Sequence, residues 1–166
     1  IVKNGGVFEC LLSGGEPLLL GDKLFAIMDV LHNDGTIFLV MTNGYLLTEK
    51  IAKRFAKYQY HWFQVSIDGA TAKYHDWFRQ TKGSWDKAVN GAKVIADNGI
   101  PLKIAHCITP YNIKDIDDMC DLAYSIGATS IMMGGISLSG RTNDNPDLLL
   151  TPQDKKIMKG KIEENR

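Results

Sequence analysis

The sequence predicts an α/β fold with roughly five parallel strands and helices outside the sheet. Short apolar runs alternate with helical patterns along the chain, and each apolar run ends in a polar or glycine-rich turn. Strands that alternate with helices indicate βα units on a parallel sheet. The carboxyl ends of such strands lie at one edge, where ligands bind, and all the polar turns fall at that edge.

The apolar runs predict the strands in order. They occupy residues 7–12, 37–41, 62–65, 102–108 and 130–134. The turns that follow them contain Gly-Gly-Glu-Pro, Thr-Asn-Gly, Ser-Ile-Asp-Gly, Thr-Pro-Tyr-Asn and Ser-Gly-Arg, in the same order. Each turn therefore brings polar groups or glycines to the expected ligand edge of the sheet.

Apolar residues at helical spacing predict a helix after each of the first four strands and one more near the end of the chain. The apolar faces of these helices are assigned to the core. Residues 137–148, rich in Ser, Gly, Asn and Asp, are expected to form a loop. The predicted helix limits are a start near Lys23, N-caps at Thr48, Ser84 and Thr151, and ends at Gly99 and Gly127.

Length and charge narrow the class of protein. The 166 residues predict one domain that can bury a core, with an ordinary hydrophobic content of 45%. Lys and Arg number 19 and Asp and Glu number 19, so the formal net charge of +0 gives no electrostatic case for nucleic acid or an anionic membrane as partner. No apolar run approaches the length of a membrane span, so we expect a cytoplasmic protein.

The three cysteines are predicted to be free thiols. Cys10 and Cys107 lie in strand patterns and Cys120 lies in a helical pattern. Their odd number and wide spacing argue against a disulfide framework and favour a reducing compartment. The sequence leaves open whether two of them meet in space.

The turn after the first apolar run carries the most specific motif. Gly14 and Gly15 let the backbone approach a ligand closely, and Pro17 constrains the exit from the turn. Free N–H groups bind a carboxylate or a phosphate, and the carboxylate of Glu16 is suited to an amine. Taken alone, the motif favours a tight turn with an exposed acid.

Polar residues in the later turns are further candidates, each with a structural alternative. Ser66 and Asp68 share one face of a strand, so both can point into a ligand site, although Asp-Gly is also a common turn pair. Asn43 and Asn112 close two other strands, where the alternative role is to stabilise the turn. Arg79 is suited to a bidentate pair with a carboxylate, and the alternative is a surface arginine.

These motifs, in this order, resemble those of the radical SAM enzymes, in which such a glycine turn binds S-adenosylmethionine (SAM). The stretch His75-Asp76-Trp77-Phe78-Arg79 resembles one in the peptide-modifying branch of that family, the SPASM-type and sulfatase-maturase-like enzymes. The resemblance implies a partial (β/α) barrel with its cofactor site at the carboxyl ends of the strands. His75 and Asp76 are equally consistent with capping of local structure.

The resemblance also implies a role for the glycine turn. Gly14, Gly15, Glu16 and Pro17 would meet the amino group of the methionine part of SAM, because an ammonium needs fixed carbonyl and carboxylate acceptors. Arg141, which follows a glycine after the fifth apolar run, resembles a Gly-Arg element of the family.

The other candidates acquire roles in the same way. By resemblance, Ser66 would meet the SAM carboxylate and Asp68 would lie near its ribose. Arg79 would pair with a carboxylate. Asn43 and Asn112 would contact SAM or support such contacts.

The chain departs from the family at the cluster ligands. The family holds a 4Fe–4S cluster with a C-x3-C-x2-C motif upstream of the glycine turn. Cys10, Cys107 and Cys120 do not have this spacing, and a cluster needs thiolate ligands. We therefore expect residues 1–166 to be a single, partial core domain, truncated at both ends, whose full-length parent holds the cluster. This chain alone is expected to bind no metal.

The expected function is that of the parent enzyme: to bind SAM and generate a 5′-deoxyadenosyl radical that modifies a peptide or protein. This chain alone is expected to be inactive. One alternative is a non-catalytic, degenerate barrel that binds a peptide or protein partner. Another is an unrelated βα-barrel enzyme whose glycine turn binds phosphate, although Glu16 argues against an anion there.

An open sheet edge is a further expectation. With the first barrel strand missing, the apolar run at residues 7–12 would have no neighbour on one side. An unpaired apolar strand is a template for another chain, and a barrel interior without its cover exposes apolar surface. We therefore expect the chain to self-associate.

Overall fold

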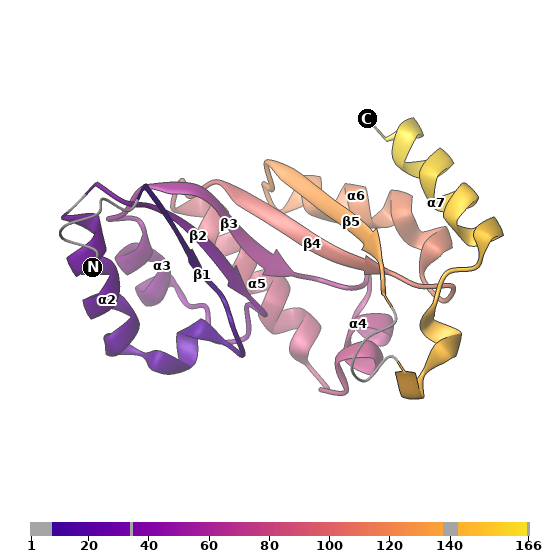
Figure 1. Ribbon diagram of the computed structural model, residues 1–166, viewed down its shortest axis with the longest axis horizontal. Coiled ribbons are helices and arrows are strands. Elements are labelled where there is room, and N and C mark those ends of the chain that lie inside the picture. Colours follow the sequence, from indigo (N-terminus) through magenta and orange to yellow (C-terminus); the bar gives the residue numbers. More distant parts are fainter. Residues whose placement is uncertain (1–7, 34, 138–142, 166) are drawn as a thin grey trace.

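The computed structural model describes residues 8–33, 35–137 and 143–165 and contains five parallel strands in one sheet. The strands lie in the order β1-β2-β3-β4-β5, so each strand pairs with the next strand along the chain (Figure 1). β1 forms one edge of the sheet and β5 forms the other. The predicted parallel α/β architecture is confirmed.

Helices alternate with the strands. The strands are β1 (Glu9–Leu12), β2 (Ile37–Thr42), β3 (Tyr60–Ser66), β4 (Leu102–Ile108) and β5 (Ser130–Gly135). The α-helices are α2 (Asp22–His32), α3 (Glu49–Phe55), α4 (Ala72–Arg79), α5 (Ser84–Asp97), α6 (Ile116–Ser125) and α7 (Pro152–Glu164). Short 3-10 turns are η1 (Pro17–Leu20), η2 (Ile113–Asp115) and η4 (Pro146–Leu148).

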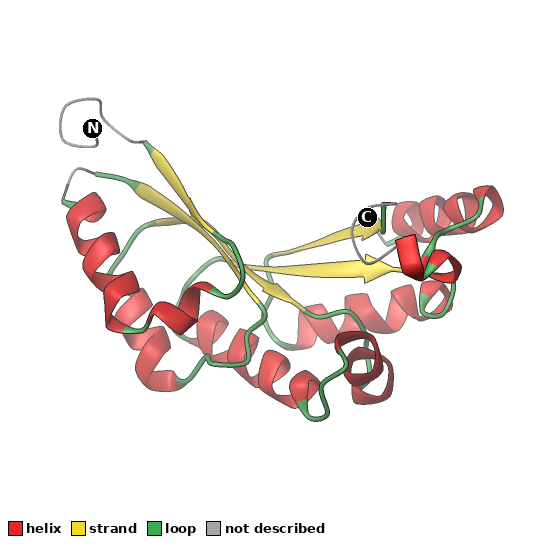
Figure 2. Cartoon of the chain, turned by 60° about the horizontal axis from the view of Figure 1, so that its bottom comes forward, coloured by secondary structure: helices red, strands yellow, loops and turns green. Residues whose placement is uncertain are grey.

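The main hydrophobic core lies between the sheet and the helices on one of its faces (Figure 2). Side chains alternate along a strand, so every second residue of the central strands enters this layer. The rings of Phe55 on α3 and Phe63 on β3 lie 5.0 Å apart there. Burial of each large apolar side chain contributes about 1.5–3 kcal/mol. The fully buried strand residues of this layer include Phe38, Val40, Phe63, Val65, Leu102 and Ile104.

The opposite face of the sheet carries a different set of side chains, several of them polar. No helix of the described residues covers it (Figure 2). We call it the helix-free face. The residues that alternation places on it include Leu39 and Met41 of β2, Trp62, Gln64 and Ser66 of β3, and Lys103, Ala105 and Cys107 of β4.

Most predicted limits are confirmed. β4 occupies the predicted residues, while β2, β3 and β5 extend the predicted runs by one or two residues at an end. β1 begins at Glu9, and Val7 of the predicted run lies outside the described residues. The hydroxyls of Thr48 and Thr151 accept the N–H of Ile51 (3.3 Å) and Asp154 (3.2 Å), as N-caps do.

The predicted cap of α5 is wrong. Ser84 is the first helical residue, and Gly83 occupies the N-cap with a φ of 79°, which glycine adopts without strain. The acceptor comes from α4, a helix that was not predicted. There the carboxylate of Asp76 accepts the N–H groups of Gly83 (2.6 Å) and Trp85 (2.8 Å). The predicted loop at 137–148 includes η4, and residues 138–142 lie outside the described part of the chain.

Candidate functional site

The carboxyl edge of the sheet borders a cavity of about 1020 Å³. Asn43 lines it from the end of β2 and Cys107 from β4. His75 and Arg79 line it from α4, and Asp147 lines it from η4. The cavity therefore gathers groups from separate parts of the chain at the edge where ligands of parallel sheets bind.

The glycine turn leaves open space above its backbone. Gly14 has a φ of 127°, a backbone conformation that residues with a Cβ rarely adopt. A Cβ added to Gly14 or Gly15 would meet no atom of the described residues within 4 Å. Pro17 is buried and starts η1, which fixes the chain direction after the turn. The exposed backbone of the two glycines is thus accessible to a ligand.

The carboxylate of Glu16 ties this turn to the next strand. It accepts the hydroxyl of Thr42 at 2.6 Å and the backbone N–H of Asn43 at 2.8 Å. It also accepts the N–H of Leu18 at 3.2 Å, which caps η1. Because protein donors already meet both oxygens, the free acceptors that this turn offers an ammonium group are backbone carbonyls and the remaining carboxylate lone pairs.

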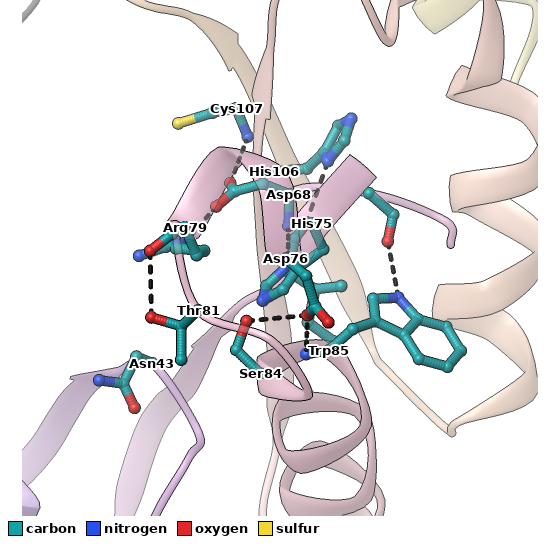
Figure 3. A network of polar contacts seen from close by, with 12 residues as sticks. Asn43, Asp68, His75, Asp76, Arg79, Thr81, Ser84, Trp85, His106 and Cys107 are labelled. Carbon is teal, nitrogen blue, oxygen red and sulfur yellow. Dashed lines mark hydrogen bonds and ion pairs between the residues drawn. The ribbon is translucent and has the colours of Figure 1, made fainter. Parts of the chain in front are cut away.

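Asp68 is the centre of the polar network at the junction of β3, α4 and β4. Its side chain is 1% exposed and lies between Arg79 and Cys107 (Figure 3). The carboxylate accepts Arg79 Nε at 2.6 Å and the Cys107 N–H at 3.1 Å, and the Asp68 N–H donates to His75 Nδ1 at 3.0 Å. Asp68 is buried and held by its other hydrogen bonds, so its charge-assisted bond to the partly exposed Arg79 fixes the position of the guanidinium.

Asn112 supports the same junction. Its amide nitrogen donates to the carbonyls of Asp68 (3.0 Å) and Cys107 (2.9 Å), and its amide oxygen accepts the N–H of Thr109 (2.8 Å). The residue is 1% exposed. Of the two roles that the sequence left open, the hydrogen bonds favour stabilisation of the turn, which also supports Asp68.

The remaining candidates lie around this junction. Arg79 keeps 35% of its side chain exposed and lines the cavity, so its guanidinium is accessible to an anion. Asn43 is exposed on the cavity wall, where its side chain accepts the N–H of Tyr45 at 2.9 Å. Ser66 is half-buried on the helix-free face. Arg141 lies outside the described residues.

Several titratable groups here have pKa values shifted mainly by burial. Burial raises the pKa of the Cys107 thiol to about 11, with help from the negative charge of Asp68. Burial lowers the pKa of His75 and of His106, which favours their neutral forms. The pKa of Asp76 is lowered by the N–H donors of Trp85 and Gly83. Cys107 is therefore a protonated thiol at neutral pH.

Sequence reasoning missed an aromatic pair at the cavity. Trp77 of α4 lines the cavity and packs edge to face with Tyr111, with ring centres 5.5 Å apart, and both residues are about half exposed. The Tyr111 hydroxyl donates to Asp147 at 2.7 Å, which links this aromatic pair to η4. The aromatic content of residues 74–78 is the signal that could have indicated Trp77.

The cysteines do not form a metal site. Cys10 packs against the core on the helix-covered face of β1, Cys107 lies on the helix-free face of β4, and Cys120 lies on α6. All three are free thiols. Among the described residues, no three His, Cys, Asp or Glu side chains are grouped to hold a metal ion. No helix of this part of the chain is long and apolar enough to cross a membrane.

Comparisons with known proteins give a consistent result. The sequence model of the Radical SAM superfamily matches residues 1–123. The mycofactocin maturase MftC of Mycobacterium tuberculosis is 36% identical over 141 residues, which cover 83% of this chain and 35% of that protein. The AdoMet-dependent heme synthase of Methanosarcina barkeri is 30% identical over 138 residues, which cover 83% of this chain and 39% of that protein. The chain thus spans 35–39% of the length of these relatives.

A solved structure shows the same fold. Streptococcus suis SuiB bound to the precursor peptide SuiA has a TM-score of 0.75 and 16% sequence identity. The superposition covers 98% of this chain and 36% of that chain. Together with the sheet order, this likeness confirms the predicted partial-barrel fold.

Proposed function

The chain belongs to the radical SAM superfamily, and on that premise we propose that its carboxyl edge binds SAM and that the whole protein modifies a peptide or protein substrate. The family uses SAM together with a 4Fe–4S cluster. The observation that carries the proposal is the ion pair between the buried Asp68 and the partly exposed Arg79, which presents an accessible guanidinium to the cavity at the carboxyl edge. Family membership also removes the alternative of an unrelated phosphate-binding barrel.

The residues at this edge fit SAM. The open backbone of Gly14 and Gly15 would supply carbonyl acceptors to its ammonium group, on a turn that Glu16 holds against β2. Arg79, oriented by Asp68, would pair with its carboxylate. Ser66 and Asn43 would offer further hydrogen bonds. When bound, SAM supplies a 5′-deoxyadenosyl radical after one-electron reduction.

The same residues do not fit a 4Fe–4S cluster. Cys10 and Cys107 lie on opposite faces of the sheet, on strands separated by two others and so about 14 Å apart. Cys120 lies on a helix outside the sheet. We therefore keep as part of the proposal that this chain alone holds no cluster and does not cleave SAM reductively.

A peptide or protein substrate is proposed from the relatives. MftC, which is similar to this chain in sequence, is a maturase, and SuiB, which is similar to it in fold, was solved with a precursor peptide. The alternative is a non-catalytic module that binds a peptide or protein, and the observation behind it is that the three cysteines of this chain lie apart. We also propose that the chain self-associates through β1, which lies at the edge of the sheet. We propose a cytoplasmic location as well, which the free thiols support.

Isothermal titration with SAM tests the proposal. The unsubstituted chain is expected to bind SAM. Arg79→Lys is expected to bind it about tenfold more weakly, because an ammonium cannot reproduce a bidentate pair. Arg54→Lys is the matched control, since Arg54 pairs with Asp22 on the helix-covered side. Circular dichroism checks that each variant is folded. Absence of SAM binding to the unsubstituted chain, or equal SAM affinity of the unsubstituted chain and Arg79→Lys, contradicts the proposed site.

A further inference from the structure

Gln64 is a buried polar residue on the helix-free face whose amide oxygen has no partner among the described residues. It lies in the central strand β3 and is 6% exposed, and its Oε1 accepts no hydrogen bond. An unsatisfied buried acceptor destabilises a fold by about 1–3 kcal/mol, so native proteins contain few of them. An apolar side chain at this position would make the fold more stable. The presence of the amide therefore indicates that it has a ligand.

Lys103 lies beside Gln64 on the next strand. The two residues are register partners in β3 and β4, and Met41 of β2 is the partner of Gln64 on its other side. The Lys103 ammonium lies 4.5 Å from the centre of the Trp62 ring, a cation–π contact that leaves its charge without an acid. Within the described residues, Lys103 makes no ion pair.

Two other ionisable side chains of this face contact each other within the described residues. His61 Nδ1 of β3 lies 2.8 Å from the Glu9 carboxylate of β1. Lys103 therefore remains as the cation of the helix-free face that has no anionic partner in the described chain. Charge complementarity selects an anionic group as its ligand, and an amide acceptor beside it selects an N–H donor.

The position of this pair suits a substrate that extends from the cavity. Cys107 lines the cavity, and Lys103 precedes it by four residues on the same strand, a distance of about 13 Å. An extended peptide covers that distance with about four residues. Trp62 of β3 and Met41 of β2 supply apolar surface on the side of the path that faces β2.

We propose that the helix-free face binds the substrate of this protein, and that Gln64 and Lys103 select a peptide that carries a carboxylate. The choice of a peptide rests on the proposed function. Lys103 pairs with the carboxylate of an acidic side chain, and the Gln64 oxygen accepts a backbone N–H of the same peptide. Trp62 packs against the intervening apolar part.

An array of synthetic octapeptides tests the selection by charge. Pools with one fixed Glu are compared with pools that have Gln at the same position, and retention of the labelled chain is measured. The unsubstituted chain is expected to prefer the Glu pools about fivefold. Lys103→Met is expected to lose the preference, and Lys103→Arg to keep it. Lys93→Met, an exposed lysine on α5, is the matched control.

The outcomes separate this inference from the proposed function. No preference for acidic pools in the unsubstituted chain, or an unchanged preference in Lys103→Met, overturns the inference even where SAM binds. Absence of SAM binding with the acidic preference retained overturns the proposed function and leaves the peptide surface in place. The SAM affinity of all these lysine variants is expected to equal that of the unsubstituted chain.

A second variant tests Gln64 by its stability and by its peptide binding. Gln64→Met replaces the amide by an unbranched apolar side chain, so the melting temperature is expected to rise by about 2–4 °C while binding of the acidic pools weakens. A fall in melting temperature would show that the amide has a partner inside the fold. Unchanged peptide binding would remove Gln64 from the proposed surface.

Discussion

Replacement of Gly91 by alanine should destabilise the chain, although it adds a better helix former to the middle of α5. Gly91 is buried where α5 crosses the turn after β2. A Cβ there would lie 2.6 Å from the carbonyl oxygen of Gly44 and 2.8 Å from the Cβ of Leu47. Neither atom is the free end of a flexible side chain, so the helix and the turn must move apart.

The magnitude follows from two opposing effects. Alanine is favoured over glycine in a helix interior by about 1 kcal/mol, whereas an extra methyl group in a tightly packed site costs about 1–3 kcal/mol. Two contacts below 3 Å place Gly91 at the upper end of that cost, so we expect a net loss of about 1–2 kcal/mol. For a chain of this size, that corresponds to a fall in melting temperature of about 2–8 °C.

Gly160 of α7 is the matched control. A Cβ at Gly160 would meet no described atom within 4 Å, so Gly160→Ala keeps the gain in helix propensity and should raise stability by about 0.5–1 kcal/mol. Urea unfolding followed by circular dichroism measures both variants. If Gly91→Ala is as stable as Gly160→Ala, the close contact between α5 and the turn is refuted. Because Gly44 adjoins Asn43, Gly91→Ala should also weaken SAM binding.

Three further predictions concern pH, iron and assembly. Burial lowers the pKa of His75 and His106, so the unfolded chain binds protons that the folded chain resists, and the free energy of unfolding should fall as the pH drops below about 6.5. Urea titrations at pH 7.5 and 5.5 measure this, and His106→Gln should reduce the difference. After anaerobic reconstitution, this chain should hold no stoichiometric cluster and form no 5′-deoxyadenosine. Iron analysis and chromatography test this, and detection of both the cluster and 5′-deoxyadenosine would disprove it. Light scattering over a dilution series should show oligomers that Leu11→Lys on β1 reduces, whereas a monodisperse monomer at high concentration would count against edge pairing.

Local patterns predicted much of the fold. β4 was predicted with its limits because its residues are mostly apolar and Pro101 and Thr109 bound the run. Thr48 and Thr151 were predicted as caps because a cap acts on an N–H three residues away. Such features depend on neighbours in sequence, and the sequence contains them directly.

Long-range contacts explain what the sequence could not predict. The sequence offered Asp76 as a cap of local structure but did not connect it with α5, so Ser84 was a reasonable but wrong choice for that helix. Motifs pointed to Glu16 and Asp68 as ligand contacts, but not to the protein donors that their carboxylates accept from β2, α4 and β4. Gln64 belongs to no motif, and its only signal was a polar residue inside an apolar run.

The strand order has a consequence for synthesis on the ribosome. Because every strand of the described residues pairs with the next one along the chain, none of these strands waits for a distant segment before it finds a neighbour. β1 ends at Leu12 and its partner β2 begins at Ile37, an interval that a ribosome translates within about 1–5 s. Each new βα unit then docks on a sheet that already exists. The growing chain can therefore acquire its fold progressively from the amino end, with one exposed growing edge at a time.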